Sequence, residues 1–344
     1  MREWVLGLVL AMGGMESAMA QDWAIVVHGG AGVIARADLS AEQEQAYRAA
    51  MGRATQAGAA VLADGGSALD AIEAAITLME DDPLFNAGRG AVFTAEGRNE
   101  LDASIMDGAT LKAGAVAGVT ATRHPIRLAR AVMDHSPHVM LAGRGADAFS
   151  ETQGLEQAPP AHFFTERRWR ALETFLRQAG LPAPARPAGI AAPDAAERLA
   201  HDEGKHGTVG VVARDQAGHV AAGTSTGGTT GKRWGRVGDS PIIGAGTYAS
   251  DASCAVSATG TGEYFIRLAV AREVCALVEH RGLSLQAAAD LVIQDKLTAL
   301  GGDGGVVAVA PDGQMAWSYN TSGMYRAKMG AGQPLQIGIY KDEP

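Results

Sequence analysis

The sequence predicts a mixed fold of α-helices and antiparallel β-hairpins, in the α+β class. Three observations support this class: capped stretches with helical periodicity, short Val/Ala/Thr-rich runs that end in glycine, and two hairpin signals in the C-terminal half. Helices and strands do not alternate strictly, which disfavours a doubly wound parallel sheet. A chain of 344 residues allows two domains or one large one, and 47% hydrophobic residues suffice for a packed core.

The N-terminal half is expected to begin with a buried strand and two helices. Ser40 and Gln43 have the spacing of a capping box, and Ser67 is a typical N-cap for the next helix. Pro125 suits the first turn of a third helix. The expected elements are a strand over 23–27 that enters a Gly-rich turn at 28–32, helices over 40–63 and 67–82, short strands between 91 and 120, and a helix over 125–133.

The C-terminal half follows a segment of different composition. Residues 181–207 hold four prolines, many alanines and few bulky apolar side chains, which predicts an exposed, mobile linker. Two pairs of strand-like runs come after it, each joined by a turn that contains Asp and Gly. The expected elements are a hairpin of 208–214 with 219–224, helices over 263–278 and 284–297, and a hairpin of 306–310 with 314–319.

Composition excludes several classes of function. The formal net charge of −9 disfavours a general nucleic-acid binder and a binder of anionic membranes. Two cysteines cannot build a disulfide framework or a Cys-based zinc site. The chain has no G-x-G-x-x-G, no complete P-loop, no G-x-S-x-G and no H-E-x-x-H pattern, so a dinucleotide, a nucleoside triphosphate or a catalytic metal is not expected.

The first twenty residues resemble a secretory signal peptide. Arg2 precedes an apolar stretch over 5–14, and Ala18-Met19-Ala20 fits the small-x-small cleavage rule. We therefore expect export to the periplasm or the medium with cleavage before Gln21; the alternative is a cytoplasmic chain that starts at Met19. If the protein is exported, Cys254 and Cys275 can pair, although two buried thiols fit the sequence equally well.

The most informative position is the threonine where the linker meets an apolar strand. A threonine hydroxyl is a poor nucleophile unless a base lies beside it. If the bond between Gly207 and Thr208 breaks, Thr208 gains a free α-amine with a pKa of about 7.7–8.0, which supplies such a base within the same residue. Gly207 tolerates the backbone conformations that such a cleavage needs. From the residues alone, the alternative of an ordinary β-branched residue at a strand start remains open.

Several further motifs, in order along the chain, resemble one family. They are His28-Gly29-Gly30-Ala31-Gly32, Pro83–Gly88, Leu101-Asp102-Ala103, Met106-Asp107-Gly108, His206–Gly210, Thr224–Gly228, Gly235–Pro241, Thr259–Glu263 and Gly323–Arg326. Together they resemble the plant-type L-asparaginase/isoaspartyl peptidase family of N-terminal-nucleophile (Ntn) hydrolases, peptidase family T2, over nearly all of the chain after Gln21. The resemblance implies a four-layer αββα sandwich that cuts itself before the nucleophilic threonine.

Residue roles follow from the same resemblance. It implies Thr208 as nucleophile, released by autocleavage after Gly207, with Thr226 orienting its hydroxyl and Asn86 steadying its surroundings. It further implies that Arg236 binds the substrate α-carboxylate and that Asp239 and Gly262 bind the α-ammonium group. Thr259 and Gly260 would then form the oxyanion hole and contact the substrate. In this interpretation 21–207 becomes an α subunit and 208–344 a β subunit.

The family also implies a structural ion and an assembly. No cofactor is expected for catalysis, but a structural Na⁺ would be held by backbone carbonyls, and the mature protein would be an (αβ)₂ heterotetramer. Lys232, Arg233 and Trp234 add bulk and charge beside the site for the substrate head, which leaves leaving-group specificity open. The residues that match the sodium loop are Met79, Glu80, Asp82, Phe85, Ala87 and Arg89.

The implied activity is hydrolysis of β-aspartyl dipeptides and L-asparagine with release of L-aspartate. Both substrates share the α-amino acid head, so the sequence does not rank them. The alternatives are a glycosylasparaginase, a protease that acts on proteins, and an unprocessed homologue that binds ligand without cleaving it.

Overall fold

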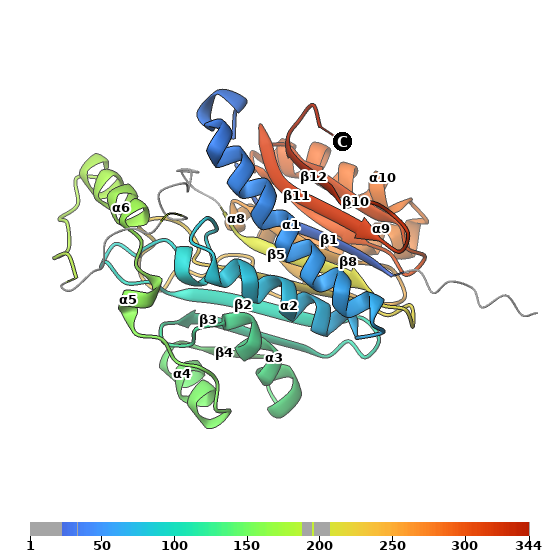
Figure 1. Cartoon of the computed structure of the whole chain (residues 1–344), viewed down its shortest axis with the longest axis horizontal. Coiled ribbons are helices and arrows are strands. Elements are labelled where there is room, and N and C mark those ends of the chain that lie inside the picture. The colour runs from blue at the N-terminus through green and yellow to red at the C-terminus, as the bar shows by residue number, and fades with distance from the viewer. Residues whose placement is uncertain (1–22, 33, 188–194, 196–206, 344) are drawn as a thin grey trace, which may run out of the picture.

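Two β-sheets lie face to face, and each is covered on its outer side by helices (Figure 1). The computed structural model describes residues 23–32, 34–187, 195 and 207–343. The predicted αββα sandwich is confirmed: one apolar cluster lies under the first helical layer, one lies between the sheets, and one lies under the second helical layer.

The larger sheet has eight strands in the order β12-β11-β1-β5-β6-β2-β3-β4, antiparallel except for the pair of β3 and β4. The strands that carry the candidate nucleophile and its partner, β5 and β6, therefore lie in the middle of the sheet. The strands are β1 (Ala24–Gly32), β2 (Leu101–Asp107), β3 (Ala113–Val119), β4 (Met140–Ala142), β5 (Val209–Arg214), β6 (Val220–Thr226), β11 (Gly323–Gly330) and β12 (Gln336–Tyr340).

The smaller sheet packs against the centre of the larger one. Its order is β10-β9-β8-β7, all antiparallel. Small and β-branched side chains, such as Val26, Val212 and Val307, fill the space between the sheets. The strands are β7 (Thr247–Ala249), β8 (Ala255–Gly260), β9 (Gly304–Val309) and β10 (Met315–Tyr319).

The helices expected over 40–63, 67–82 and 125–133 are confirmed, whereas α4, α5 and α6 were not predicted. Ser40 accepts a hydrogen bond from the Gln43 amide and closes the expected capping box, while Ser67 accepts one from the Asp70 amide. Figure 1 shows α1 and α2 crossing the face of the large sheet. The helices on this side are η1 (Arg36–Asp38), α1 (Ala41–Ala63), α2 (Ala68–Asp81), η2 (Gly88–Gly90), α3 (Pro125–His135), α4 (Gly143–Thr152), α5 (Pro160–Phe163) and α6 (Glu166–Gln178).

The second helical layer corrects the sequence prediction. The single helix expected over 263–278 is broken at Ala269, which has a left-handed φ of 48°. The helix expected over 284–297 continues through a π-helical turn to Leu300. The helices are α8 (Gly262–Leu268), α9 (Val270–Arg281), α10 (Leu285–Asp290), η3 (Leu291–Leu297) and α11 (Thr298–Leu300).

A second correction concerns residues 28–32. They do not form the expected turn but continue β1 to Gly32, with an irregularity between His28 and Gly30 where the register with β11 shifts. The strand therefore carries His28 into the centre of the sheet beside β5. The predicted signal peptide and most of the predicted linker, residues 188–194 and 196–206, lie outside the described residues.

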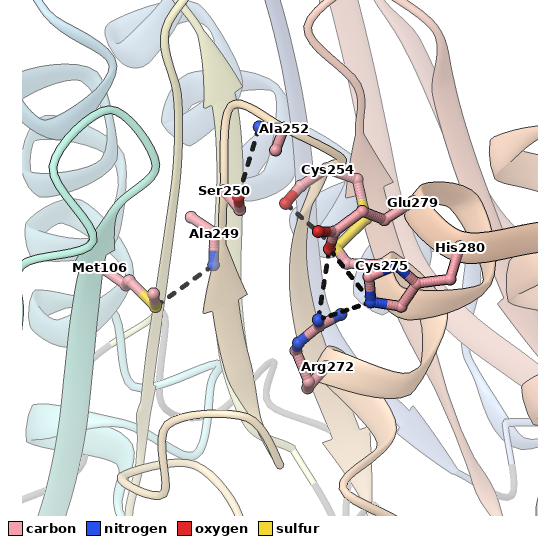
Figure 2. Close-up of a disulfide and its surroundings, with 9 residues drawn as sticks. All are labelled: Met106, Ala249, Ser250, Ala252, Cys254, Arg272, Cys275, Glu279 and His280. Atoms are coloured by element: carbon pink, nitrogen blue, oxygen red, sulfur yellow. Dashed lines mark hydrogen bonds and ion pairs between the residues drawn. A yellow bond between two sulfur atoms is a disulfide. The ribbon is translucent and has the colours of Figure 1, made fainter. Parts of the chain in front are cut away.

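The two cysteines form a disulfide, which settles a pairing that the sequence left open (Figure 2). Cys254 directly precedes β8 and Cys275 lies in α9, with 5.3 Å between their Cα atoms and both side chains buried. The bond thus ties the strand that ends at Thr259 and Gly260 to the helical layer behind it. Of the helices in the described part of the chain, none combines the length and apolar character that crossing a membrane requires.

We expect the double variant Cys254→Ala/Cys275→Ala to lose about 3 kcal/mol of stability, because the disulfide closes a loop with a sequence separation of 21. A lower melting temperature, together with a matching loss when the wild type is reduced, is the expected result. Titration of two free thiols in unreduced, unfolded wild-type protein would contradict the bond.

Candidate active site

Two threonine hydroxyls meet in the centre of the large sheet. Thr208 directly precedes β5, and Thr226 ends the antiparallel neighbour β6. Because Val209 lies opposite Ser225, the register brings the two threonines together. Thr208 Oγ1 donates to Thr226 Oγ1 at 3.0 Å, and both residues are buried. The two predicted catalytic threonines are therefore in direct contact.

Asn86 holds the backbone on the other side of the Gly207–Thr208 bond. Its amide N–H donates to the Gly207 carbonyl oxygen at 3.1 Å. Its side chain donates from Nδ2 to the Gly228 carbonyl at 2.8 Å, and Oδ1 accepts from the Val92 amide at 2.9 Å. Asn86 thus fixes the candidate scissile carbonyl through its backbone, while its side chain anchors the loop after Thr226.

The glycines of β1 provide the space for this segment. Gly30 has a φ of +118°, and a Cβ added there would lie 2.7 Å from the Gly207 Cα. A side chain at this position would displace the candidate cleavage bond. The Gly-rich motif at 28–32 therefore lets the backbone of β1 approach the backbone of Gly207 closely, and it does not form a turn.

His28 binds the backbone of the candidate nucleophile. Its Nδ1 lies 3.1 Å from the Thr208 carbonyl oxygen, and its Nε2 lies 3.0 Å from Ser257 Oγ. A carbonyl only accepts, so Nδ1 carries the proton and Nε2 accepts from the serine hydroxyl. Complete burial lowers the pKa of His28 to about 3 and keeps the ring neutral.

A chain of buried hydroxyls continues from His28 across the space between the sheets. Ser257 Oγ lies 2.7 Å from Thr224 Oγ1, which lies 2.6 Å from Thr247 Oγ1. Ser104 Oγ lies 2.7 Å from Thr247 Oγ1 and donates to the Ser240 carbonyl at 2.6 Å. The chain thus links the Thr208 backbone to the segment that carries Asp239.

Arg236, Asp239 and Gly262 form a second cluster, as the sequence predicts. A Cβ added at Gly262 would lie 2.8 Å from Asp239 Oδ1 and 3.1 Å from Arg236 Nη2. Burial raises the pKa of Asp239 to about 7, against the lowering effect of nearby Arg236. Asp239 Oδ2 is buried and finds no hydrogen-bond partner among the described residues. The site therefore presents an unsatisfied carboxyl oxygen suited to a cation.

The guanidinium of Arg236 pairs with Glu263 rather than with Asp239. Nε lies 2.9 Å from Oε1 and Nη2 lies 3.1 Å from Oε2, a bidentate pair. Glu263 is thus the salt-bridge partner of Arg236. Glu263 ends the motif Thr259–Glu263, beside the predicted Gly262, but no role for it follows from the sequence.

The predicted oxyanion residues end strand β8 in the smaller sheet. Thr259 is fully buried, and its hydroxyl accepts from the Ala31 amide at 3.3 Å. Gly260 has a φ of +155°, and a Cβ there would lie 2.6 Å from Phe265 Cε2. Ser257, two residues earlier in β8, contacts His28, so this strand lies against the segment that holds Thr208.

Around the predicted sodium loop, the acidic side chains are engaged elsewhere. Glu80 accepts from the Ile126 amide and from Ser225 Oγ, and Asp82 accepts from the Leu84 amide and Arg53. Burial raises the pKa of both carboxyl groups. Within the described ranges no group of three or more His, Cys, Asp or Glu side chains is placed to hold a metal ion.

Lys232 lies differently from what its sequence position suggests. It is buried, with Nζ donating to the Glu100 carbonyl at 2.8 Å and lying 4.0 Å from Asp102 Oδ2. Trp234 is 88% exposed, and the Arg233 guanidinium lies 4.3 Å from the centre of its ring. Of these three residues, only Arg233 and Trp234 add their bulk at the surface.

Sequence reasoning missed the hydroxyl chain, and it assigned no role to Glu263 although that residue lies in one of the motifs. Thr224 and Thr226 are two residues apart on one strand and so share a face, which is a weak signal for an inward polar row. Ser257, Thr247 and Ser104 come from three other strands, and only the pairing of the sheets brings them together.

An αββα sandwich with a threonine at the head of a central strand defines the class of Ntn hydrolases. The family model for asparaginase matches residues 21–339. Isoaspartyl peptidases of Salmonella typhimurium and Escherichia coli are 50% and 48% identical to this chain, over 92% and 93% of it and 98% and 96% of their own lengths. An isoaspartyl peptidase/L-asparaginase of Homo sapiens is 38% identical over 93% of this chain and 96% of its own. The chain belongs to the asparaginase family and is a hydrolase.

We expect Ser257→Ala to lower stability by about 1–3 kcal/mol, because it leaves His28 Nε2 without a partner in a buried space and removes one of the hydrogen bonds of Thr224. Maturation should slow as well, since His28 holds the Thr208 carbonyl. Ser253→Ala is the matched control: Ser253 Oγ is buried and has no partner in the described part of the chain. Equal melting temperatures and maturation rates for the two variants would contradict a role for the hydroxyl chain.

Proposed function

We propose that the protein is an autocatalytically processed hydrolase of β-aspartyl dipeptides and L-asparagine, which releases L-aspartate through a β-aspartyl-Thr208 intermediate. The contact of the Thr208 and Thr226 hydroxyls at 3.0 Å, directly after the candidate cleavage bond, carries the proposal. The names of the relatives, isoaspartyl peptidase and isoaspartyl peptidase/L-asparaginase, support the substrate class.

Maturation begins with attack of Thr208 Oγ1 on the Gly207 carbonyl carbon. The C–N bond breaks, the nitrogen receives the hydroxyl proton, and water hydrolyses the resulting ester. The Asn86 amide, 3.1 Å from the Gly207 oxygen, is placed to stabilise the negative charge that develops there. The products are an α subunit of residues 21–207 and a β subunit of residues 208–344, with a free amine on Thr208.

Turnover uses the same hydroxyl with the new amine as base. Arg236 takes the substrate α-carboxylate, and Asp239 with Gly262 takes the α-ammonium group, which fixes the head of the substrate. Thr208 Oγ1 attacks the side-chain carbonyl carbon, its proton passes to the α-amine, and the leaving amine departs with a proton. Thr259 and Gly260 donate to the carbonyl oxygen as it becomes negative. Water then hydrolyses the ester.

We further propose export with removal of residues 1–20. The disulfide supports an oxidising compartment, since such bonds persist there and are rare in the cytosol. The alternative, a cytoplasmic chain from Met19, predicts two thiols in the freshly isolated protein. Alkylation of the protein in intact cells, followed by mass measurement, distinguishes these outcomes.

Two properties of the family complete the proposal. The mature enzyme is an (αβ)₂ heterotetramer, which light scattering would test. A structural Na⁺ is coordinated by backbone carbonyls of the loop that contains Met79, Glu80, Asp82, Phe85, Ala87 and Arg89. Glu80 Oε1 and Asp82 Oδ1 already accept hydrogen bonds from backbone amides, and carbonyl oxygens of the loop suit a hard cation. Melting in choline chloride in place of sodium chloride tests the ion.

The active protein should have two N-termini, one at Gln21 and one at Thr208. N-terminal sequencing should yield a fragment that begins TVGVV, and Thr208→Ala should remain one chain and show no turnover. Thr208→Ser, which keeps a hydroxyl, is the control that should still be cleaved. Turnover by uncleaved Thr208→Ala protein would exclude Thr208 as the nucleophile.

A substrate panel on mature protein tests the activity itself. We expect release of L-aspartate from β-aspartyl dipeptides and from L-asparagine, because both present the head that Arg236 and Asp239 bind. Faster cleavage of a sugar-linked asparagine would assign the protein to the glycosylasparaginases, and cleavage of unfolded proteins would assign it to the proteases. Binding of L-aspartate without any cleavage at Gly207 would indicate an unprocessed homologue.

A further inference from the structure

Glu263 engages one edge of the arginine that is proposed to bind the substrate. The Arg236 guanidinium contacts it through Nε at 2.9 Å and Nη2 at 3.1 Å. The Arg236 side chain is 18% exposed, whereas the Glu263 side chain is 57% exposed. An exposed ion pair of this kind adds little to stability. Its effect is geometric, because two parallel hydrogen bonds fix the plane and rotation of the guanidinium.

The remaining edge of the guanidinium lies toward the threonine pair. A Cβ added at Gly238 would lie 2.9 Å from Arg236 Nη1, and one added at Gly228 would lie 3.5 Å from it. Gly228 in turn donates its amide to Thr226 Oγ1 at 3.0 Å. Nη1 therefore lies against the backbone of Gly238 and close to Gly228, beside the candidate nucleophile, and the Lys232 ammonium lies near Gly228 as well.

We propose that Glu263 is a positioning residue for substrate binding: it holds the Nε/Nη2 edge of Arg236 so that the Nη1 edge receives the substrate α-carboxylate. This inference rests on the proposed function and deepens it. A guanidinium has five N–H donors, and Glu263 uses only the Nε and Nη2 edge. A substrate carboxylate can therefore bind at the Nη1/Nη2 end while Glu263 stays in place. The opposite possibility, competition of Glu263 with the substrate for Arg236, predicts the opposite change in KM.

Glu263 also acts on the carboxyl group that is proposed to bind the α-ammonium. The groups that face Asp239 are Arg236, which lowers its pKa, and Glu263 and Asp102, which raise it. Lys232 lies 4.0 Å from Asp102 and offsets part of that charge. Asp239 must be ionised to hold an ammonium group. Removing the Glu263 charge should therefore lower the pKa of Asp239 and move the acidic limb of kcat/KM to lower pH.

The experiment compares mature Glu263→Gln and Glu263→Asp with the wild type. Glu73→Gln is the matched control, since Glu73 pairs with Arg127 at 3.1 Å between α2 and α3, in the opposite helical layer. We expect Glu263→Gln to raise KM for L-asparagine about 10-fold with kcat nearly unchanged, as one charge-assisted contact weakens. Glu73→Gln should leave both constants as in the wild type.

The pH profile separates positioning from charge. Glu263→Asp keeps the charge but is one methylene shorter, so its KM should rise while its acidic limb stays near that of the wild type. Glu263→Gln should show both changes. An unchanged or lower KM for Glu263→Gln would overturn the inference. Calorimetry with L-aspartate on mature protein tests the proposed function separately: if the wild type neither binds L-aspartate nor turns over substrate, the proposed function fails, whatever the variants do.

Discussion

The arrangement of the whole site depends on how the backbone on both sides of the Gly207–Thr208 bond is held. Asn86 donates to the oxygen before the bond, and His28 donates to the oxygen after it. The Thr208 hydroxyl is held by Thr226 between them. A hydroxyl gains reactivity from a fixed position beside its target more than from acidity, because proximity removes an entropic cost. The antiparallel neighbours of β5, namely β1 and β6, supply His28 and Thr226, so the order of strands in the sheet is itself the positioning device.

Burial between the two sheets determines which groups of the site carry a charge. His28 is fully buried, so its ring stays neutral and its tautomer is set by its hydrogen-bond partners. Gly210, opposite His28 in β5, is required because a Cβ there would overlap with His28 Nε2 and Ser257 Oγ. Neutral hydroxyls hydrogen-bond to one another in this space, namely those of Ser257, Thr224, Thr247 and Ser104. Burying hydrogen-bonded neutral groups costs less free energy than burying a charge. Asp239 differs, since one of its oxygens is left unsatisfied at the end of this chain, and that is where a ligand cation would lie.

Local signals predicted much of the fold, and tertiary pairing explains the rest. The caps at Ser40 and Ser67 specify helix starts within four residues, and Asp215–Gly218 closes its hairpin locally, so these elements were correct. The strand through 28–32 was missed because its glycines are typical of a turn, whereas here they admit the backbone of Gly207 from a distant part of the chain. The break at Ala269 has no local breaker and separates α8 from α9, which packs against β7 and β8. In the site, Thr208, Thr226, Arg236 and Asp239 lie in recognisable motifs, but the hydroxyl chain is assembled from four strands and has no linear signature.

The site divides into a buried half and an exposed half with different tolerance to change. The threonines, His28 and the hydroxyl chain are buried and closely packed, so a change of volume or polarity there disturbs the candidate nucleophile. The exposed half consists of Glu263, which holds Arg236 from the solvent side, and the surface pair of Arg233 and Trp234 in the same loop. The hydrogen bond from the Arg236 amide to the Arg233 carbonyl joins this surface pair to the arginine that we propose binds the substrate. Because Glu263 contacts the Nε/Nη2 edge of Arg236 and not Thr208, sequence changes in the exposed half leave the hydrogen bond between the buried threonines in place.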